Sequence, residues 1–113
     1  MKKDFRDYIN DILNSINEVE EFTERMSFNE FVKDKKTINA VIRSLEVLGE
    51  AVKNIPEEIK AKERQVPWKR MAGMRDKLIH EYFGVDLEIV WAVVKQELPP
   101  LKPIIQTIKD KIA

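Results

Sequence analysis

The sequence predicts an all-α fold, an antiparallel four-helix bundle with extra short helices. Apolar residues recur at steps of three and four along most of the chain, as on the buried face of an amphipathic helix. No segment shows the alternation of apolar and polar residues that a half-buried strand requires. The chain has 113 residues, 43% of them hydrophobic and 35% charged, which suits one compact helical domain. We therefore expect a single domain over residues 1–113.

An apolar stripe and a capping motif place the first two helices. We expect the first helix over residues 3–26, where the apolar positions keep a helical period. Ser27 and Glu30 then have the spacing of a capping box, in which each side chain accepts from the other residue's backbone N–H. The capping box predicts a short second helix over residues 28–33.

A threonine and a proline delimit the next helix. Thr37 can cap a long helix over residues 37–54, which ends because the residue before Pro56 avoids helical angles. Pro56 can itself open a new short turn. A polar connector is expected after it, over residues 57–65.

The following helix is expected over residues 67–83, from Pro67 to a stop at Gly84. Gly73 interrupts this helix, which predicts either a kink or a close contact with another helix there.

An aspartate and two prolines define the C-terminal part of the chain. Asp86 can cap a helix over residues 87–97. Pro99 and Pro100 are expected to break this helix, because proline lacks the N–H that a helix interior requires. The last helix is then expected from residue 101 to residue 112.

Composition excludes several classes of function. With no cysteine and one histidine, a single chain cannot form disulfides, thiolate zinc sites or multi-histidine metal sites. Three glycines cannot build a phosphate loop or a dinucleotide fingerprint. No apolar run approaches the roughly 20 residues of a membrane helix, and the N-terminus has no apolar signal segment. We expect no cofactor, no metal, no membrane association and a cytoplasmic location.

The net charge of zero hides a basic run. Residues 60–77 contain seven basic side chains and two acidic ones, whereas the segments on either side are net acidic. Such a run is often only the solvated face of a helix. It can also form a patch that faces an anion or RNA.

The only histidine of the chain follows this basic run. Arg75 and His80 lie about 140° apart around an ideal helix, so they flank one groove rather than sharing one stripe. Histidine transfers protons near neutral pH, and arginine binds phosphate and the charge of a phosphoryl transition state. The pair suits metal-independent RNA cleavage, in which a ribose 2′-hydroxyl attacks its own phosphate. Because that reaction uses an acid and a base, one histidine per chain favours a homodimer with a composite site.

The residues around this pair resemble the HepT-like family of the HEPN superfamily. Arg75-x4-His80-x-Tyr82 matches the motif of the superfamily, and Asp76 stands where it often has a polar residue. The resemblance covers nearly the whole chain and includes four further segments, Met26-Ser27-Phe28-Asn29-Glu30-Phe31, Ala40-Val41-Ile42-Arg43-Ser44-Leu45-Glu46-Val47-Leu48-Gly49-Glu50-Ala51, Val66-Pro67-Trp68-Lys69 and Phe83-Gly84-Val85-Asp86.

This resemblance implies a ribonuclease toxin of a two-gene toxin–antitoxin pair, with a bundle that dimerises around the motif. It implies a minimal nucleotidyltransferase antitoxin as the partner, which silences the toxin by transferring AMP from ATP onto Tyr82. In this interpretation His80 is the general acid or base, and Arg75 binds phosphate and stabilises the transition state. Asp76 orients a catalytic side chain or contacts RNA.

Lys69, Arg70 and Lys77, in the basic run, are the expected RNA contacts. An alternative is a non-catalytic subunit that binds nucleotide or substrate for a separate nucleotidyltransferase. Arg75 and His80 would then hold a phosphate and cleave nothing. A third possibility is a bundle without an active site. The motif disfavours the third possibility, but the sequence does not separate the first two.

Overall fold

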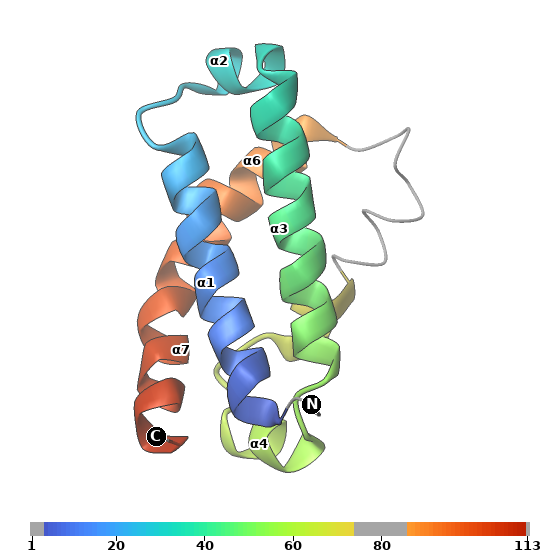
Figure 1. Ribbon diagram of the computed structural model, residues 1–113, viewed down its shortest axis with the longest axis vertical. Coiled ribbons are helices and arrows are strands. Elements are labelled where there is room, and N and C mark those ends of the chain that lie inside the picture. The colour runs from blue at the N-terminus through green and yellow to red at the C-terminus, as the bar shows by residue number, and fades with distance from the viewer. Residues whose placement is uncertain (1–3, 74–85, 113) are drawn as a thin grey trace.

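The computed structural model of the protein describes residues 4–73 and 86–112 (Figure 1). Within these two ranges all regular secondary structure is helical, which confirms the predicted fold class. Residues 68–73 are helical as well. The other elements, in chain order, are α1 (Phe5–Thr23), α2 (Phe28–Lys33), α3 (Lys35–Lys53), α4 (Glu57–Lys62), α6 (Leu87–Ala92), the π-helical turn η2 (Val93–Glu97) and α7 (Leu98–Ile112).

Three long helices form the body of the molecule. In Figure 1, α1 lies between α3 and α7 and runs antiparallel to both. The short helix α2 packs on α3 and α6 at one end, and α4 lies at the other end. The long helix expected over residues 67–83 is described only over residues 68–73.

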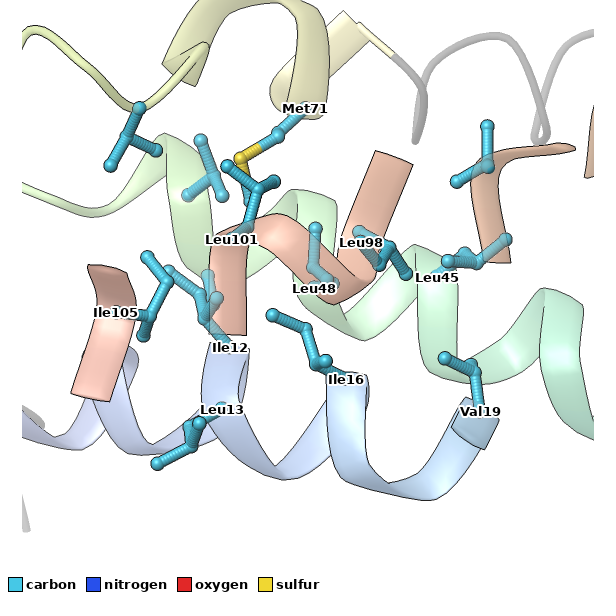
Figure 2. Close-up of a cluster of buried hydrophobic side chains, with 14 of the residues drawn as sticks. Ile12, Leu13, Ile16, Val19, Leu45, Leu48, Met71, Leu98, Leu101 and Ile105 are labelled. Atoms are coloured by element: carbon cyan, nitrogen blue, oxygen red, sulfur yellow. The ribbon is translucent and has the colours of Figure 1, made fainter. Parts of the chain in front are cut away.

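A single hydrophobic core joins these helices, and α4 packs against it only through the partly buried Ile59. Figure 2 shows aliphatic side chains of α1, α3 and α7 converging on one layer, with Met71 reaching in from the segment 68–73. Ile16, Leu48 and Ile105 are completely buried there. Each such side chain stabilises the folded state by about 1.5–3 kcal/mol through its burial. The core thus joins helices from both ends of the chain.

The first helix is shorter than the expected range 3–26. It ends at Thr23, because Glu24 takes an extended ψ of 131° and Arg25 a positive φ of 65°. The buried Thr23 hydroxyl donates to the Val19 carbonyl oxygen at 2.7 Å. The sequence contains no proline or glycine at this point that would have signalled the end of the helix.

The capping box before α2 is confirmed, whereas the cap expected for α3 is wrong. The Ser27 and Glu30 side chains accept from each other's backbone N–H at 3.1 and 3.0 Å. The N-cap of α3 is Asp34, whose carboxylate accepts from the backbone N–H and the hydroxyl of Thr37 at 3.0 and 2.8 Å. These bonds lower the pKa of Asp34. A carboxylate is a better acceptor for a helix N-terminus than a hydroxyl, so α3 begins at residue 35.

The connector expected after Pro56 contains a helix. Residues 57–62 form α4, for which Pro56 is the N-cap residue. Two glutamates in the first turn and two lysines at the end complement the helix dipole of this short element. The turn expected at Pro56 therefore continues into α4.

Pro99 and Pro100 do not break the chain between two helices, contrary to the prediction. α6, η2 and α7 follow one another without a gap, and both prolines lie in the first turn of α7. The backbone N–H of Leu98 donates to the Val93 carbonyl oxygen, five residues back. In the wider π turn, the carbonyl groups before Pro99 and Pro100 are displaced from the positions where the proline rings would clash with them. A π turn has no recognisable sequence signal, so this continuity was not predictable.

Gly73 is the last residue described before residue 86. A Cβ atom built on it would have no described heavy atom within 4 Å. Among the described residues, Gly73 therefore makes no close contact with another helix. The kink or contact expected at Gly73 involves the residues that follow it, which lie outside the described ranges, so it stays a prediction.

Candidate functional site

The segment that leads into the predicted motif is anchored in the core. Val66 and Met71 are only 3% and 2% exposed. Trp68 is also buried, and its indole N–H donates to the Glu63 carbonyl oxygen at 3.0 Å. Met71 and Leu101 lie in the same core cluster, where Figure 2 shows their side chains close together. These buried contacts fix residues 66–72 against the hydrophobic core.

A groove with a volume of about 780 Å³ lies between α4 and this segment. Its lining combines apolar surface with four cationic side chains and a single carboxylate. We call it the basic groove. It is lined by Glu57, Lys60, Ala61, Arg64, Val66, Pro67, Trp68, Lys69, Arg70 and Ala72.

The four cations of the basic groove are not equivalent. Lys60 pairs with Glu57 at 3.6 Å, and Arg70 pairs with Glu97 of η2 at 2.6 Å. Arg64 and Lys69 are exposed, and neither forms an ion pair with any residue that the structure describes. The groove therefore presents two cations that no carboxylate within residues 4–73 and 86–112 neutralises.

Glu63 stabilises the turn that precedes Trp68 in the wall of the basic groove. The Glu63 carboxylate accepts from the side-chain amide of Gln65 at 2.8 Å and from the Lys111 ammonium at 3.3 Å. The bond from Gln65, followed by that from Lys111, lowers the pKa of Glu63 despite the opposing effect of burial. Glu63 is thus ionised at neutral pH and ties the turn before Trp68 to the end of α7.

The structure accounts for only part of the predicted site. Lys69 and Arg70 both line the basic groove, as the charge run suggested. The other predicted site residues lie outside the described ranges, namely Arg75, Asp76, Lys77, His80 and Tyr82. Arg64 was not singled out from sequence, although it belongs to the same basic run. The basic run indicated the charge of Arg64, but its place on the basic groove depends on the turn before Val66, which the sequence pattern does not reveal.

A second hollow of about 790 Å³ lies between the end of α1 and the η2–α7 junction. We call it the α1 hollow. Its lining carries three glutamates and three cations, and two of the cations are engaged. Lys102 pairs with Glu20 at 3.3 Å, and Lys95 donates to the Thr23 carbonyl oxygen at 3.0 Å. Lys95 also stands 4.9 Å from the centre of the Trp91 ring. This hollow is therefore balanced in charge and internally bonded.

No helix within residues 4–73 and 86–112 is long and apolar enough to cross a membrane. In the same two ranges, no three histidine, aspartate or glutamate side chains gather closely enough to hold a metal ion.

The fold and the groove define an all-α protein with a surface complementary to an anion. Comparison with protein families identifies the family. The model described as "Ribonuclease HepT-like" matches residues 12–108, and the chain belongs to this HepT-like ribonuclease family. The resemblance stated from the motifs is thereby confirmed.

Curated relatives agree with this assignment. A "Putative RNase" of Methanocaldococcus jannaschii is 56% identical over 96% of this chain and 91% of its own length. The "Probable ribonuclease HepT" of Thermococcus cleftensis is 52% identical over 90% of this chain and 93% of its own length. A "Putative RNase" of Caldanaerobacter subterraneus is 47% identical over 94% of this chain and 95% of its own length. No solved structure matches the chain.

Proposed function

We propose that the protein is a metal-independent endoribonuclease that acts as a cytoplasmic toxin under the control of a nucleotidyltransferase antitoxin. Membership of a ribonuclease family is the observation that carries this proposal. The basic groove supports it, because its cationic lining lies on the segment that runs directly into the Arg75-x4-His80-x-Tyr82 motif. Phosphate contacts of this kind dominate the affinity of proteins for nucleic acids.

The proposed reaction is an internal phosphoryl transfer. A base removes the proton of the ribose 2′-hydroxyl, and the 2′-oxygen forms a bond to the adjacent phosphorus. The bond to the 5′-oxygen breaks, and an acid protonates the leaving oxygen. The products are a 2′,3′-cyclic phosphate and a 5′-hydroxyl. His80 supplies the proton transfers, and Arg75 binds the phosphate and its developing charge. Asp76 orients one of these side chains or contacts RNA.

A homodimer completes the proposed site. Each chain has one histidine, whereas the reaction uses a base and an acid. Two copies of His80 across a twofold axis would provide both. Sedimentation of the purified protein at micromolar concentration tests this step. A dimer is expected, and an active monomer would contradict the composite site.

Regulation is proposed to act on Tyr82. The tyrosine oxygen attacks the α-phosphorus of ATP in the antitoxin, pyrophosphate leaves, and AMP remains on the tyrosine. The added phosphate brings bulk and negative charge next to the site where the RNA phosphate binds. Both effects oppose RNA binding, which would silence the ribonuclease.

Cleavage of RNA by the purified protein in excess EDTA tests the activity. We expect cleavage with 2′,3′-cyclic phosphate ends, and its loss in His80→Ala. Arg75→Ala removes one charged donor to the transition state, a change that typically costs about 10²–10³ in rate. Strict dependence on magnesium would contradict the mechanism. Nucleotide binding without any cleavage would favour the non-catalytic subunit instead.

Intact mass after incubation with the antitoxin, ATP and magnesium tests the modification. The wild-type chain should gain about 329 Da for each AMP that is transferred. Tyr82→Phe should keep the fold and gain no mass, whereas Tyr8→Phe, the matched control at the only other tyrosine, should gain as much as wild type. The same gain in Tyr82→Phe would place the modification elsewhere.

A further inference from the structure

The basic groove has a chemical character that the proposed ribonuclease function does not by itself explain. Its lining contains exposed apolar surface from Ala61 and Pro67, partly buried apolar surface from Ala72, and cations. A surface that only attracts a phosphate backbone needs charge and no apolar hollow. A lining with both characters fits a ligand that has both, and a nucleotide combines an apolar base with an anionic phosphate.

We propose that the basic groove binds a short stretch of single-stranded RNA, with Arg64 and Lys69 holding phosphates and the apolar lining contacting a base or ribose. The inference rests on the proposed ribonuclease function and names the class of RNA that the enzyme accepts. Single strands are typically bound in positively charged grooves in which unpaired bases meet protein surface.

The ion pairs of the basic groove indicate why these two cations, and not the other two, would bind phosphate. Lys60 and Arg70 already have carboxylate partners in Glu57 and Glu97, so a phosphate would have to displace those partners. Arg64 and Lys69 form no ion pair among the described residues, and both are exposed. A phosphate held by both therefore gains their attraction without breaking an ion pair to any described residue.

The dimensions of the groove disfavour a duplex. Its volume of about 780 Å³ falls in the range of about 300–1,000 Å³ typical of small-ligand sites. An RNA duplex keeps its bases stacked inside and presents a broad backbone surface, so no base can enter such a hollow. The indole of Trp68 is 8% exposed and its N–H is already bonded, so it forms part of the wall and offers no stacking face.

The test measures binding of a short 2′-O-methyl RNA strand, which lacks the attacking hydroxyl and is not cleaved. The variant is the double substitution Arg64→Gln and Lys69→Gln. Lys62→Gln is the matched control, because Lys62 is exposed in the same basic run but does not line the groove. Affinity for the single strand is compared with affinity for a duplex of the same length, over a series of salt concentrations.

The double variant should bind the single strand about tenfold more weakly, and its salt slope should fall by about 1.4, since each phosphate contact to a single strand contributes about 0.7. Lys62→Gln should stay within twofold of wild type, and the duplex should bind more weakly than the single strand. An equal loss in Lys62→Gln, or equal binding of the duplex, would overturn the inference.

Cleavage of natural RNA separates this inference from the function on which it rests. If wild type cleaves in EDTA and the double variant binds and cleaves normally, the groove proposal is wrong and the ribonuclease proposal stands. If binding depends on Arg64 and Lys69 but nothing is cleaved, the ribonuclease proposal is wrong and single-strand binding by the groove is supported.

Discussion

The basic groove and the α1 hollow have nearly equal volumes, about 780 and 790 Å³, but they use their cations differently. In the α1 hollow, Lys102 neutralises a glutamate and Lys95 bonds a helix-terminal carbonyl. The third cation, Arg25, shares the lining with two further glutamates, so the lining carries no net charge. In the basic groove, Arg64 and Lys69 have no such partner among the described residues. The difference teaches that the size of a hollow does not indicate a ligand site. The excess of cations over carboxylates in the lining of the basic groove is the more informative signal.

The largest expected effect tests whether the basic groove depends on the core. Met71→Ala should lower the free energy of unfolding by about 2–4 kcal/mol, because it leaves a cavity beside Leu101. RNA binding should fall with it, since residues 66–72 lose their anchor. Chemical denaturation and RNA titration measure both effects. Met71→Leu is the volume-matched control and should cost less than about 1.5 kcal/mol. A fully stable Met71→Ala protein would show that other contacts hold the groove.

The next effect separates the two hollows directly. Lys95→Met removes the ammonium from the Thr23 carbonyl and from the Trp91 ring, and should lower the free energy of unfolding by about 1–2 kcal/mol. RNA affinity should not change. The matched substitution Lys69→Met should do the opposite, with stability within about 0.5 kcal/mol and weaker RNA binding. If both variants lose RNA affinity equally, the two hollows do not differ as described.

A smaller effect is expected at the ion pair between Arg70 and Glu97. Glu97→Gln releases Arg70 toward the basic groove, so RNA should bind about two- to threefold more tightly, in line with the modest energy of exposed pairs. Arg70→Gln should weaken binding only slightly. A lower cleavage rate with unchanged affinity in Glu97→Gln would instead show that the pair positions the helix before the motif.

The smallest effect concerns the acid stability of the turn beneath the groove. The pKa of Glu63 lies below its ordinary value of 4.5 in the folded protein, because Gln65 and Lys111 bond the carboxylate. The resulting stability is complete above the ordinary pKa and is lost as pH falls through the lowered folded-state value. Glu63→Gln should therefore lose less stability between about pH 6 and pH 3 than wild type, as measured by denaturation at each pH. An unchanged pH profile would contradict this role.

Several local signals in the sequence predicted helices correctly. The Ser27–Glu30 capping box and the cap at Asp86 are where the pattern indicated, and the apolar stripe of α1 is buried as expected. The C-terminal end of α1 was missed because it depends on a backbone reversal at Arg25. The N-terminal end of α3 was missed because local geometry makes Asp34, not Thr37, the N-cap. The continuity of α6 into α7 was missed because it depends on a π turn.

The charge of the candidate site could be predicted from the sequence, but the ion pairs and the shape of its surface could not. The basic run indicated an anion-facing patch, and Lys69 and Arg70 do line the basic groove. Sequence alone could not show that Arg70 has a partner in Glu97, which lies 27 positions away along the chain. The roles of Arg75, His80 and Tyr82 stay predictions from the motif, and the variants described above test them. The roles of Asp76, from the motif, and of Lys77, from the basic run, also stay predictions.

Only one of the two tryptophans of the chain, Trp68, lines either of the two hollows. Trp68 forms part of the basic groove, while Trp91 packs against Phe28 and Phe31 beneath the Lys95 ammonium of the α1 hollow. The protein therefore contains one tryptophan in the wall of the basic groove and one outside it. In a Trp91→Phe variant the remaining emission comes from the groove wall alone, so a stopped-flow experiment could follow the arrival of a strand there in real time and without a label.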